Sequence, residues 1–414
     1  MGLDLTSFDA ALKEYYTDDV VQDMVYKKNP LLALMPKMEE FYGKSLPVPI
    51  IYGNPQGRSG SFARAQARSS TTTLLKDFNL TRNHDYGIAT IDNETLEASK
   101  NDKGAFLDAA TTEIDGIINS LTRSLATAMY GTGFGGIGVV GSFATTTITL
   151  SSIESVTNFE VGMELTVAAA EGSGNTKAYG SSGNGLIITG VNRVTGVLTF
   201  GFNVDDATNG IPLIANADTI FVRGDRIESG TISFSKIVGL KGWVPESAPS
   251  STAFFGVDRT ADVTRLGGVR FDGSALPIEE ALIEGAALCA REGGAPDYCF
   301  MSTGKFADLE KALGSKVQYV DLKVGGIGFR GINIHGQNGD IKVLGDMNCP
   351  ENSAWMLQMD VWKLYSLGKS VRVIDTDGLK MLRQATADGV EVRYGYYAQM
   401  GCRAPGFNLN LKLG

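Results

Sequence analysis

The clearest hydrophobic pattern in the chain lies between Asn101 and Gly131. After a first step of seven positions, its large apolar residues recur every three or four positions, and charged or amide side chains fall between them. This spacing predicts one helix with a buried apolar stripe, roughly 40 Å long at ~1.5 Å per residue. The stripe consists of Leu107, Ile114, Ile118, Leu121, Leu125 and Met129.

Residues 1–40 carry a second helical rhythm of apolar positions, interrupted by Pro30 and Pro36. An apolar segment of this kind needs a surface that covers it. Two interpretations stay open: an N-terminal arm that packs on a partner, and an ordinary N-terminal helix that packs on its own domain.

Residues 41–92 have an extended pattern. Lys44–Ile51 predicts an edge strand, because Pro47 and Pro49 cannot donate to a central ladder. Phe78–Thr81 and His84–Ile91 continue the extended pattern beyond a glycine-rich stretch that is longer than usual loops. We interpret the whole as a two-stranded excursion whose tip is either a disordered loop or a projection that binds carboxylates of a neighbouring chain. The basic residues of the tip, with no acid among them, are Arg58, Arg64 and Arg68.

Residues 141–226 differ in composition from both flanks, with Thr, Ser, Val, Ile, Asn and Gly dominant. Short strands separated by glycine- and asparagine-rich turns predict a small β-barrel or sandwich, inserted as a unit of its own. The expected strands are Thr146–Leu150, Met163–Val167, Gly185–Ile188, Val197–Phe200 and Thr219–Val222.

The remaining chain mixes helices and strands, so the predicted fold class is α+β. Proline near the first turn and Gly293 at the end bound a helix over Pro277–Arg291, and Ser302 or Thr303 caps another over Lys305–Leu313. The expected strands are Thr231–Leu240, Tyr298–Met301, Val317–Val324, Gly331–His335, Ile341–Leu344, Ala354–Gln358, Val371–Ile374 and a closing pair, Val390–Ala398 and Phe407–Leu413.

Composition narrows the function. A net charge of −9 argues against a general nucleic-acid binder, which normally has a basic surface. The four cysteines are far apart in sequence, which favours free thiols in a reducing compartment. No apolar run is long enough for a membrane span and no signal-peptide pattern opens the chain. We therefore expect a soluble chain.

The sequence contains no convincing motif for a catalytic, nucleotide-binding or metal site. Only two histidines are present, and glycine strings such as Gly131–Gly136 match the dinucleotide fingerprint without the required strand before and helix after them. Adjacent carboxylates such as Glu279 and Glu280 diverge on a helix. The sequence thus predicts no enzyme, no cofactor and no metal site.

The order of these parts resembles the major capsid protein of tailed double-stranded DNA bacteriophages, the Hong Kong 97 fold. The helix, strand and capped helix of GAPDYCFMSTGKFADLEKALG resemble the axial domain, and RYGYYAQMGCRAPGFNLNLKL resembles the return to the peripheral domain. The resemblance rests on architecture and includes no short diagnostic motif. It implies this division: 1–40 N-terminal arm, 41–92 extended loop, 93–140 peripheral domain with the spine helix, 141–226 inserted β domain, 227–255 peripheral strands, 256–374 axial domain and 375–414 peripheral return strands.

The resemblance implies a subunit that assembles as hexamers and pentamers into an icosahedral shell around double-stranded DNA, which it contacts non-specifically. It implies assembly in the bacterial cytoplasm, a location in the virion capsid, a portal, a separate scaffolding protein and possible decoration proteins. No membrane is involved. An encapsulin-like compartment shell and a phage tail or baseplate protein are the alternatives, and an enzyme comes third.

Overall fold

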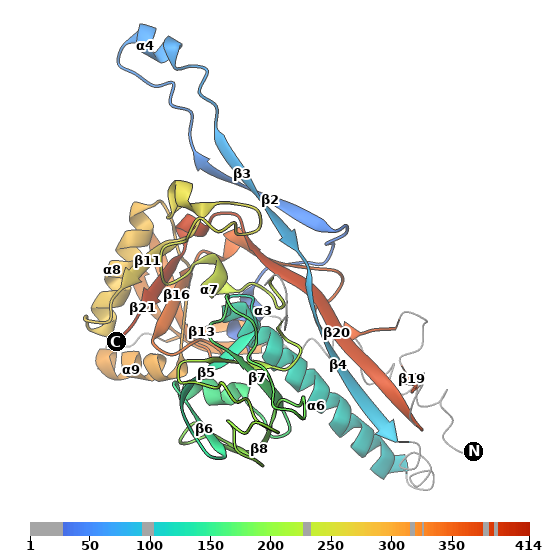
Figure 1. Ribbon diagram of the computed structural model, residues 1–414. Coiled ribbons are helices and arrows are strands. Elements are labelled where there is room, and N and C mark those ends of the chain that lie inside the picture. Colours follow the sequence, from blue (N-terminus) through green and yellow to red (C-terminus); the bar gives the residue numbers. More distant parts are fainter. Residues whose placement is uncertain are drawn as a thin grey trace.

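The computed structural model describes residues 28–92, 103–226, 233–314, 319–324, 327–375, 381–384 and 388–414. Within these residues a six-stranded sheet carries the long helix, a seven-stranded sheet carries two shorter helices, a closed barrel stands beside the long helix, and a two-stranded hairpin projects from the body (Figure 1).

The long helix, α6 (Lys103–Tyr130), confirms the prediction from the apolar stripe. It lies against β4 (Asn83–Asp92) and β20 (Gly389–Cys402), which pair along ten residues. A Cβ at Gly87 of β4 would come within 2.6 Å of Ile117, so this glycine lets the helix approach the strand closely. The stripe residues Ile114, Ile118, Leu121, Leu125 and Met129 are buried, whereas the side chain of Leu107 lies outside the described residues.

The six-stranded sheet is organised around β20, the longest strand. Its order is β1–β17–β20–β18, and β4 and β19 also pair with β20. Alternate residues of β20, such as Val392, Tyr394 and Tyr396, are buried in the core that includes the α6 stripe. The other strands are β1 (Lys37–Met38), β17 (Trp362–Ser366), β18 (Arg372–Val373) and β19 (Met381–Arg383).

The described part of the N-terminal segment belongs to the body of the chain. Helix α3 (Pro30–Leu34) buries Leu31 and Leu32 in the main core, and β1 pairs in parallel with β17. Residues 28–40 therefore pack on their own domain, the second of the two interpretations. Residues 1–27, where an arm is also expected, lie outside the described residues.

The inserted unit is a closed six-stranded barrel with a separate hydrophobic core. The strand order is β10–β5–β6–β9–β8–β7. Its first strand begins at Gly136, before the expected boundary at 141, because the glycine-rich run after α6 forms a strand and not a linker. The strands are β5 (Gly136–Ala144), β6 (Thr147–Leu150), β7 (Glu164–Ala168), β8 (Leu186–Asn192), β9 (Val197–Phe200) and β10 (Thr219–Val222).

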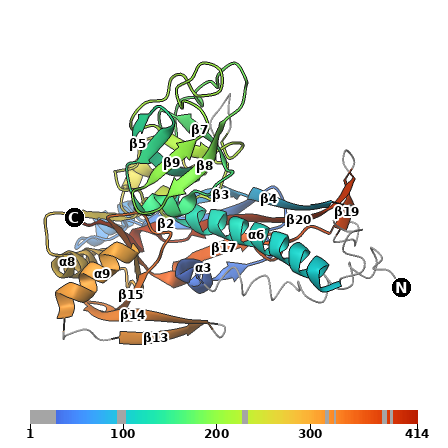
Figure 2. The ribbon, with the colours of Figure 1, turned by 90° about the horizontal axis from the view of Figure 1, so that it is seen from below.

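The seven-stranded sheet has the order β11–β21–β16–β12–β15–β14–β13 and packs against α8 (Ile278–Arg291) and α9 (Thr303–Leu313) (Figure 2). Ser302 caps α9 by accepting a hydrogen bond from the Lys305 amide, as predicted. The strands are β11 (Val269–Asp272), β12 (Tyr298–Met301), β13 (Tyr319–Val324), β14 (Ile327–Gly336), β15 (Gly339–Gly345), β16 (Ser353–Leu357) and β21 (Leu409–Lys412).

Three expectations about the boundaries between these units need correction. The closing strands do not form a pair: β20 lies in the sheet under α6, whereas β21 pairs with β11 and β16 in the other sheet. Strands β17 and β18, expected in the axial domain, pair with β20. The described part of the expected strand Thr231–Leu240 is not a strand, since consecutive residues Ile237 and Val238 are both buried and α7 (Leu240–Trp243) begins there.

Candidate functional site

The projecting hairpin consists of β2 (Ser45–Gly53) and β3 (Leu74–Thr81) and is anchored at its base. Val48, Ile50, Phe78 and Leu80 alternate along the two strands and are buried in the main core. The Phe78 ring meets Trp243 edge-on at a centroid distance of 5.1 Å. The hairpin therefore extends from a packed base, as Figure 1 shows.

The distal part of the hairpin exposes apolar side chains. Ile51 and Leu75 are cross-strand partners and are 60% and 57% exposed. Pro47 and Pro49 occupy alternate positions of β2, which among the described strands pairs with β3 alone. Proline lacks an N–H, so this pattern disfavours the addition of another strand at the outer edge of β2. The hairpin is suited to contact through its faces and its tip.

The tip contains a short helix, α4 (Phe62–Ala67), with no buried residue. Phe62 is 82% exposed. The predicted residues Arg58, Arg64 and Arg68 all lie at this tip and are exposed. No ion pair joins them to a carboxylate of the described residues. The tip thus presents an aromatic ring and three positive charges, and its contact with a neighbouring chain stays a prediction.

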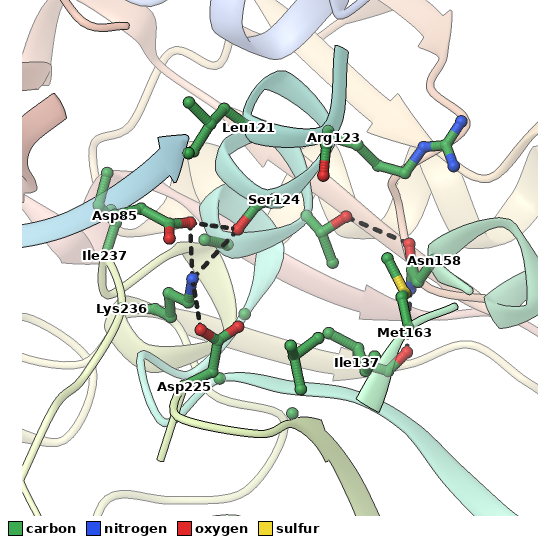
Figure 3. A pocket seen from close by; sticks show the side chains of 18 of the residues that line it. Asp85, Leu121, Arg123, Ser124, Ile137, Asn158, Met163, Asp225, Lys236 and Ile237 are labelled. Atoms are coloured by element: carbon green, nitrogen blue, oxygen red, sulfur yellow. Dashed lines mark hydrogen bonds and ion pairs between the residues drawn. The ribbon is translucent and has the colours of Figure 1, made fainter. Parts of the chain in front are cut away.

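A second polar site lies where the barrel meets α6, and no sequence pattern predicts it. The Lys236 ammonium lies 2.6 Å from an Asp85 oxygen and 3.0 Å from an Asp225 oxygen (Figure 3). Ser124 of α6 donates to Asp85 at 2.6 Å. Burial favours the neutral amine of Lys236, but Asp225 and then Asp85 outweigh it and raise the pKa of Lys236 above its ordinary value. Burial raises the pKa of Asp225, and Lys236 opposes that shift.

A cavity of about 460 Å³ borders this cluster. Residues of β4 and α6 line one side and residues of the barrel line the other, as the sticks of Figure 3 show. Two polar contacts cross the junction: Thr127 donates to Asn158 at 3.2 Å, and Arg123 pairs with Glu160. The side chains that make these two contacts are partly exposed.

The motifs that imitate catalytic sites have structural roles here. Gly133 and Gly135 have positive φ and connect α6 to a strand, so no helix N-terminus follows them to bind a phosphate. His335 Nδ1 lies 2.6 Å from an Asp340 oxygen in the β14–β15 hairpin, and the exposed His84 ring lies tilted against Tyr86 with centroids 5.1 Å apart. In the part of the chain that the structure describes, no three or more metal-binding side chains gather. Helices within that part include none long and apolar enough to cross a membrane.

The four cysteines are free and buried. Burial raises the pKa of Cys289 to about 12 and raises the pKa values of the other three thiols as well. A thiol that stays protonated is a poor nucleophile. These residues therefore act as small apolar side chains of the core.

No protein-family model and no curated protein matches the chain. Solved structures do. The chain is similar to phage capsid proteins. The capsid asymmetric unit of cyanophage A-1(L) matches with 13% identity over 92% of both chains and a TM-score of 0.47. The capsid of a native GTA particle matches with 10% identity over 93% of this chain and 89% of that chain, with a TM-score of 0.45. The holo-SrpI encapsulin complex from Synechococcus elongatus matches with 8% identity over 97% of this chain and 94% of that chain, with a TM-score of 0.41.

All three TM-scores are below 0.5. Sequence reasoning found the hairpin tip and the helix stripe. It missed the Lys236 cluster. Lys236 is 151 positions from Asp85 in the sequence, and the two meet only because β4, α6 and the exit of the barrel converge. The one available signal was a lysine within the mostly apolar stretch Phe234–Leu240.

Proposed function

We propose that this chain is the major capsid protein of a tailed bacteriophage and assembles into a closed shell. The observation that carries the proposal is the hairpin, which projects from a packed base and exposes apolar and basic side chains that nothing in the described chain covers. Such a projection has a use when a neighbouring copy receives it.

The rest of the architecture supports the same proposal. The two sheets share one continuous core, in which Tyr130 of α6 contacts Trp355 of β16 with ring centroids 5.7 Å apart. The body is therefore one stiff unit that carries a long projection. Repeated heterologous contacts between stiff units generate closed or helical assemblies, and many small interfaces then add up.

The proposed partners follow from this role. Copies of the chain form hexamers and pentamers, a separate scaffolding protein and a portal direct assembly in the bacterial cytoplasm, and decoration proteins are optional. The enclosed DNA is contacted non-specifically, because a net charge of −9 does not favour tight binding to phosphates. The shell is the location of the mature protein.

The experiment shortens the hairpin in the full chain. Residues 54–73 are replaced by Asn-Gly, so that β2 and β3 close through a two-residue turn. The variant should keep the melting temperature of the parent subunit, because the buried base residues stay in place, and should form no particles in sedimentation and electron microscopy. Particles of unchanged yield would show that the hairpin is not an assembly contact.

An encapsulin-like compartment shell is the second candidate, since it needs the same projecting contacts. The content of the particles separates the two. Particles that package nuclease-protected DNA in the presence of a portal and packaging motor favour the phage shell, whereas particles that enclose only a co-expressed protein favour the compartment.

A further inference from the structure

The charges at the barrel–helix junction do not balance. One ammonium, that of Lys236, serves the carboxylates of both Asp85 and Asp225. Asp85 also accepts from Ser124, whereas among the described residues the Asp225 side chain has no partner besides Lys236. The side chain of Asp225 is 21% exposed, so it can be reached from the cavity that it lines. Within this cluster, two carboxylates therefore share one positive charge.

A buried hydroxyl next to this cluster also lacks a partner. Tyr396 of β20 is 1% exposed, and among the described residues its hydroxyl makes no hydrogen bond. It lies close enough to Asp85 and Asp225 that both carboxylates, after the larger effect of burial, raise its pKa. An unpaired buried hydroxyl is costly, but Tyr396 does not line the cavity, so a ligand there meets the carboxylates and not this hydroxyl.

The rest of the lining comes from two different units and combines apolar side chains with the charged residues Arg123, Glu160, Glu171 and Arg223. Ile117 and Leu121 of α6 face the cavity from one side, and Ile137, Met163 and Val222 of the barrel face it from the other (Figure 3 labels three of them). Its volume of about 460 Å³ lies within the range of small-molecule sites. A ligand that fills this space must combine an apolar body with a positively charged donor.

We propose that this cavity binds a small primary ammonium with an apolar chain. The ammonium sits at Asp225, where it supplies the missing positive charge, and the chain lies between α6 and the barrel. A ligand in this position touches both units and holds the barrel against the helix. The proposal is independent of the function proposed above, because it concerns a cavity inside one chain.

The test measures binding of four probes to the purified full chain by calorimetry: hexylammonium, ethylammonium, hexanol and hexanoate. Hexylammonium should bind tightest, because it alone offers both the charge and the apolar chain. Each methylene that enters the cavity should strengthen binding up to about fourfold, and hexanol should bind at least about tenfold more weakly than hexylammonium. Equal binding of hexanol and hexylammonium would overturn the proposal.

Two variants locate the site. Asp225→Asn removes the charge and keeps the shape of the side chain. It should weaken the binding of hexylammonium at least about tenfold without changing the binding of hexanol. Ile137→Trp fills the cavity and should weaken the binding of both probes. The control, Asp205→Asn, removes an exposed barrel carboxylate outside the cavity lining and should change the binding of neither probe.

Circular dichroism identifies a variant that fails to fold, and the four-probe comparison on the parent chain keeps the proposal testable in that case. If hexylammonium does not bind, and Asp225→Asn instead reduces self-association in sedimentation, a lysine of a second copy occupies the cavity and the proposal is wrong.

Discussion

The packing of α6 gives the most quantitative prediction. Ile118 lies in the middle of the apolar stripe and is fully buried between the helix and the sheet. Ile118→Ala removes three carbon atoms, which is worth about 2.4 kcal/mol at ~0.8 kcal/mol per carbon. A cavity that cannot collapse adds to this, and we expect a loss of ~2–5 kcal/mol. Ile118→Asp should cost more, because it places an unpaired carboxylate in the core.

The matched control is the next residue, Asn119, which is exposed on the same turn of α6. Asn119→Ala should change the free energy of unfolding by no more than ~0.5 kcal/mol. The assay is urea unfolding of the purified subunit, monitored through the helical signal in circular dichroism. The melting temperature of each variant is measured as a second indicator of stability. Equal stability of Ile118→Ala and Asn119→Ala would refute the assignment of the stripe to the core.

Three further predictions concern the other units. The barrel, residues 136–226, has its own core and closes its own sheet, so it should fold alone with a cooperative melt and a β-type spectrum, and a random-coil spectrum would contradict this. Replacing Arg58, Arg64 and Arg68 with alanine should leave the subunit's melting temperature unchanged but lower particle yield, more so at high salt; a yield equal to that of the parent chain at both salt concentrations would count against an assembly role. Lys236→Met leaves two carboxylates unpaired at the junction and should cost ~3–5 kcal/mol in urea unfolding, whereas a neutral effect would show that the cluster is solvated.

The elements that the sequence predicted well are those whose pattern is local. The stripe from Ile114 to Met129 repeats along one helix face and needs no knowledge of its partner, and α6 spans nearly the predicted residues. Strand β12 matches its predicted bounds, Tyr298–Met301, because it is a short apolar run between a helix end and a cap. The inserted β unit could also be predicted, as a barrel or a sandwich, since turn residues separate its short strands; the structure shows a barrel.

The pairing of distant segments could not be predicted in the same way. Val390–Ala398 and Phe407–Leu413 read alike in sequence, yet β20 and β21 enter different sheets. That choice is made by their partners β4, β11 and β16, and no local pattern encodes it. Strand β5 was missed because its glycines suggest a loop, although the barrel brings Phe159 close to Gly138 and leaves no space for a side chain there.

The candidate sites show the same difference between residues that are close in sequence and residues that meet only in the fold. The arginines of the hairpin tip could be found because they are neighbours in sequence without nearby acids. The Lys236 cluster could not, because its residues come from β4, from the exit of the barrel and from the segment that follows it. The half-buried Asp115 shows a related limit: it lies off the apolar stripe, but its charge contributes, after burial, to the raised pKa of Tyr394. Asp115 is therefore a poorer control than Asn119 for a substitution that should leave the stability of the subunit unchanged.

The most direct test of the central claim is the mass distribution of the purified full chain, expressed with the proposed scaffolding protein and measured by mass photometry alongside electron microscopy. A shell subunit predicts a narrow population of closed particles with on the order of hundreds of copies. A chain that stays a monomer or a small defined oligomer under every assembly condition would contradict the account.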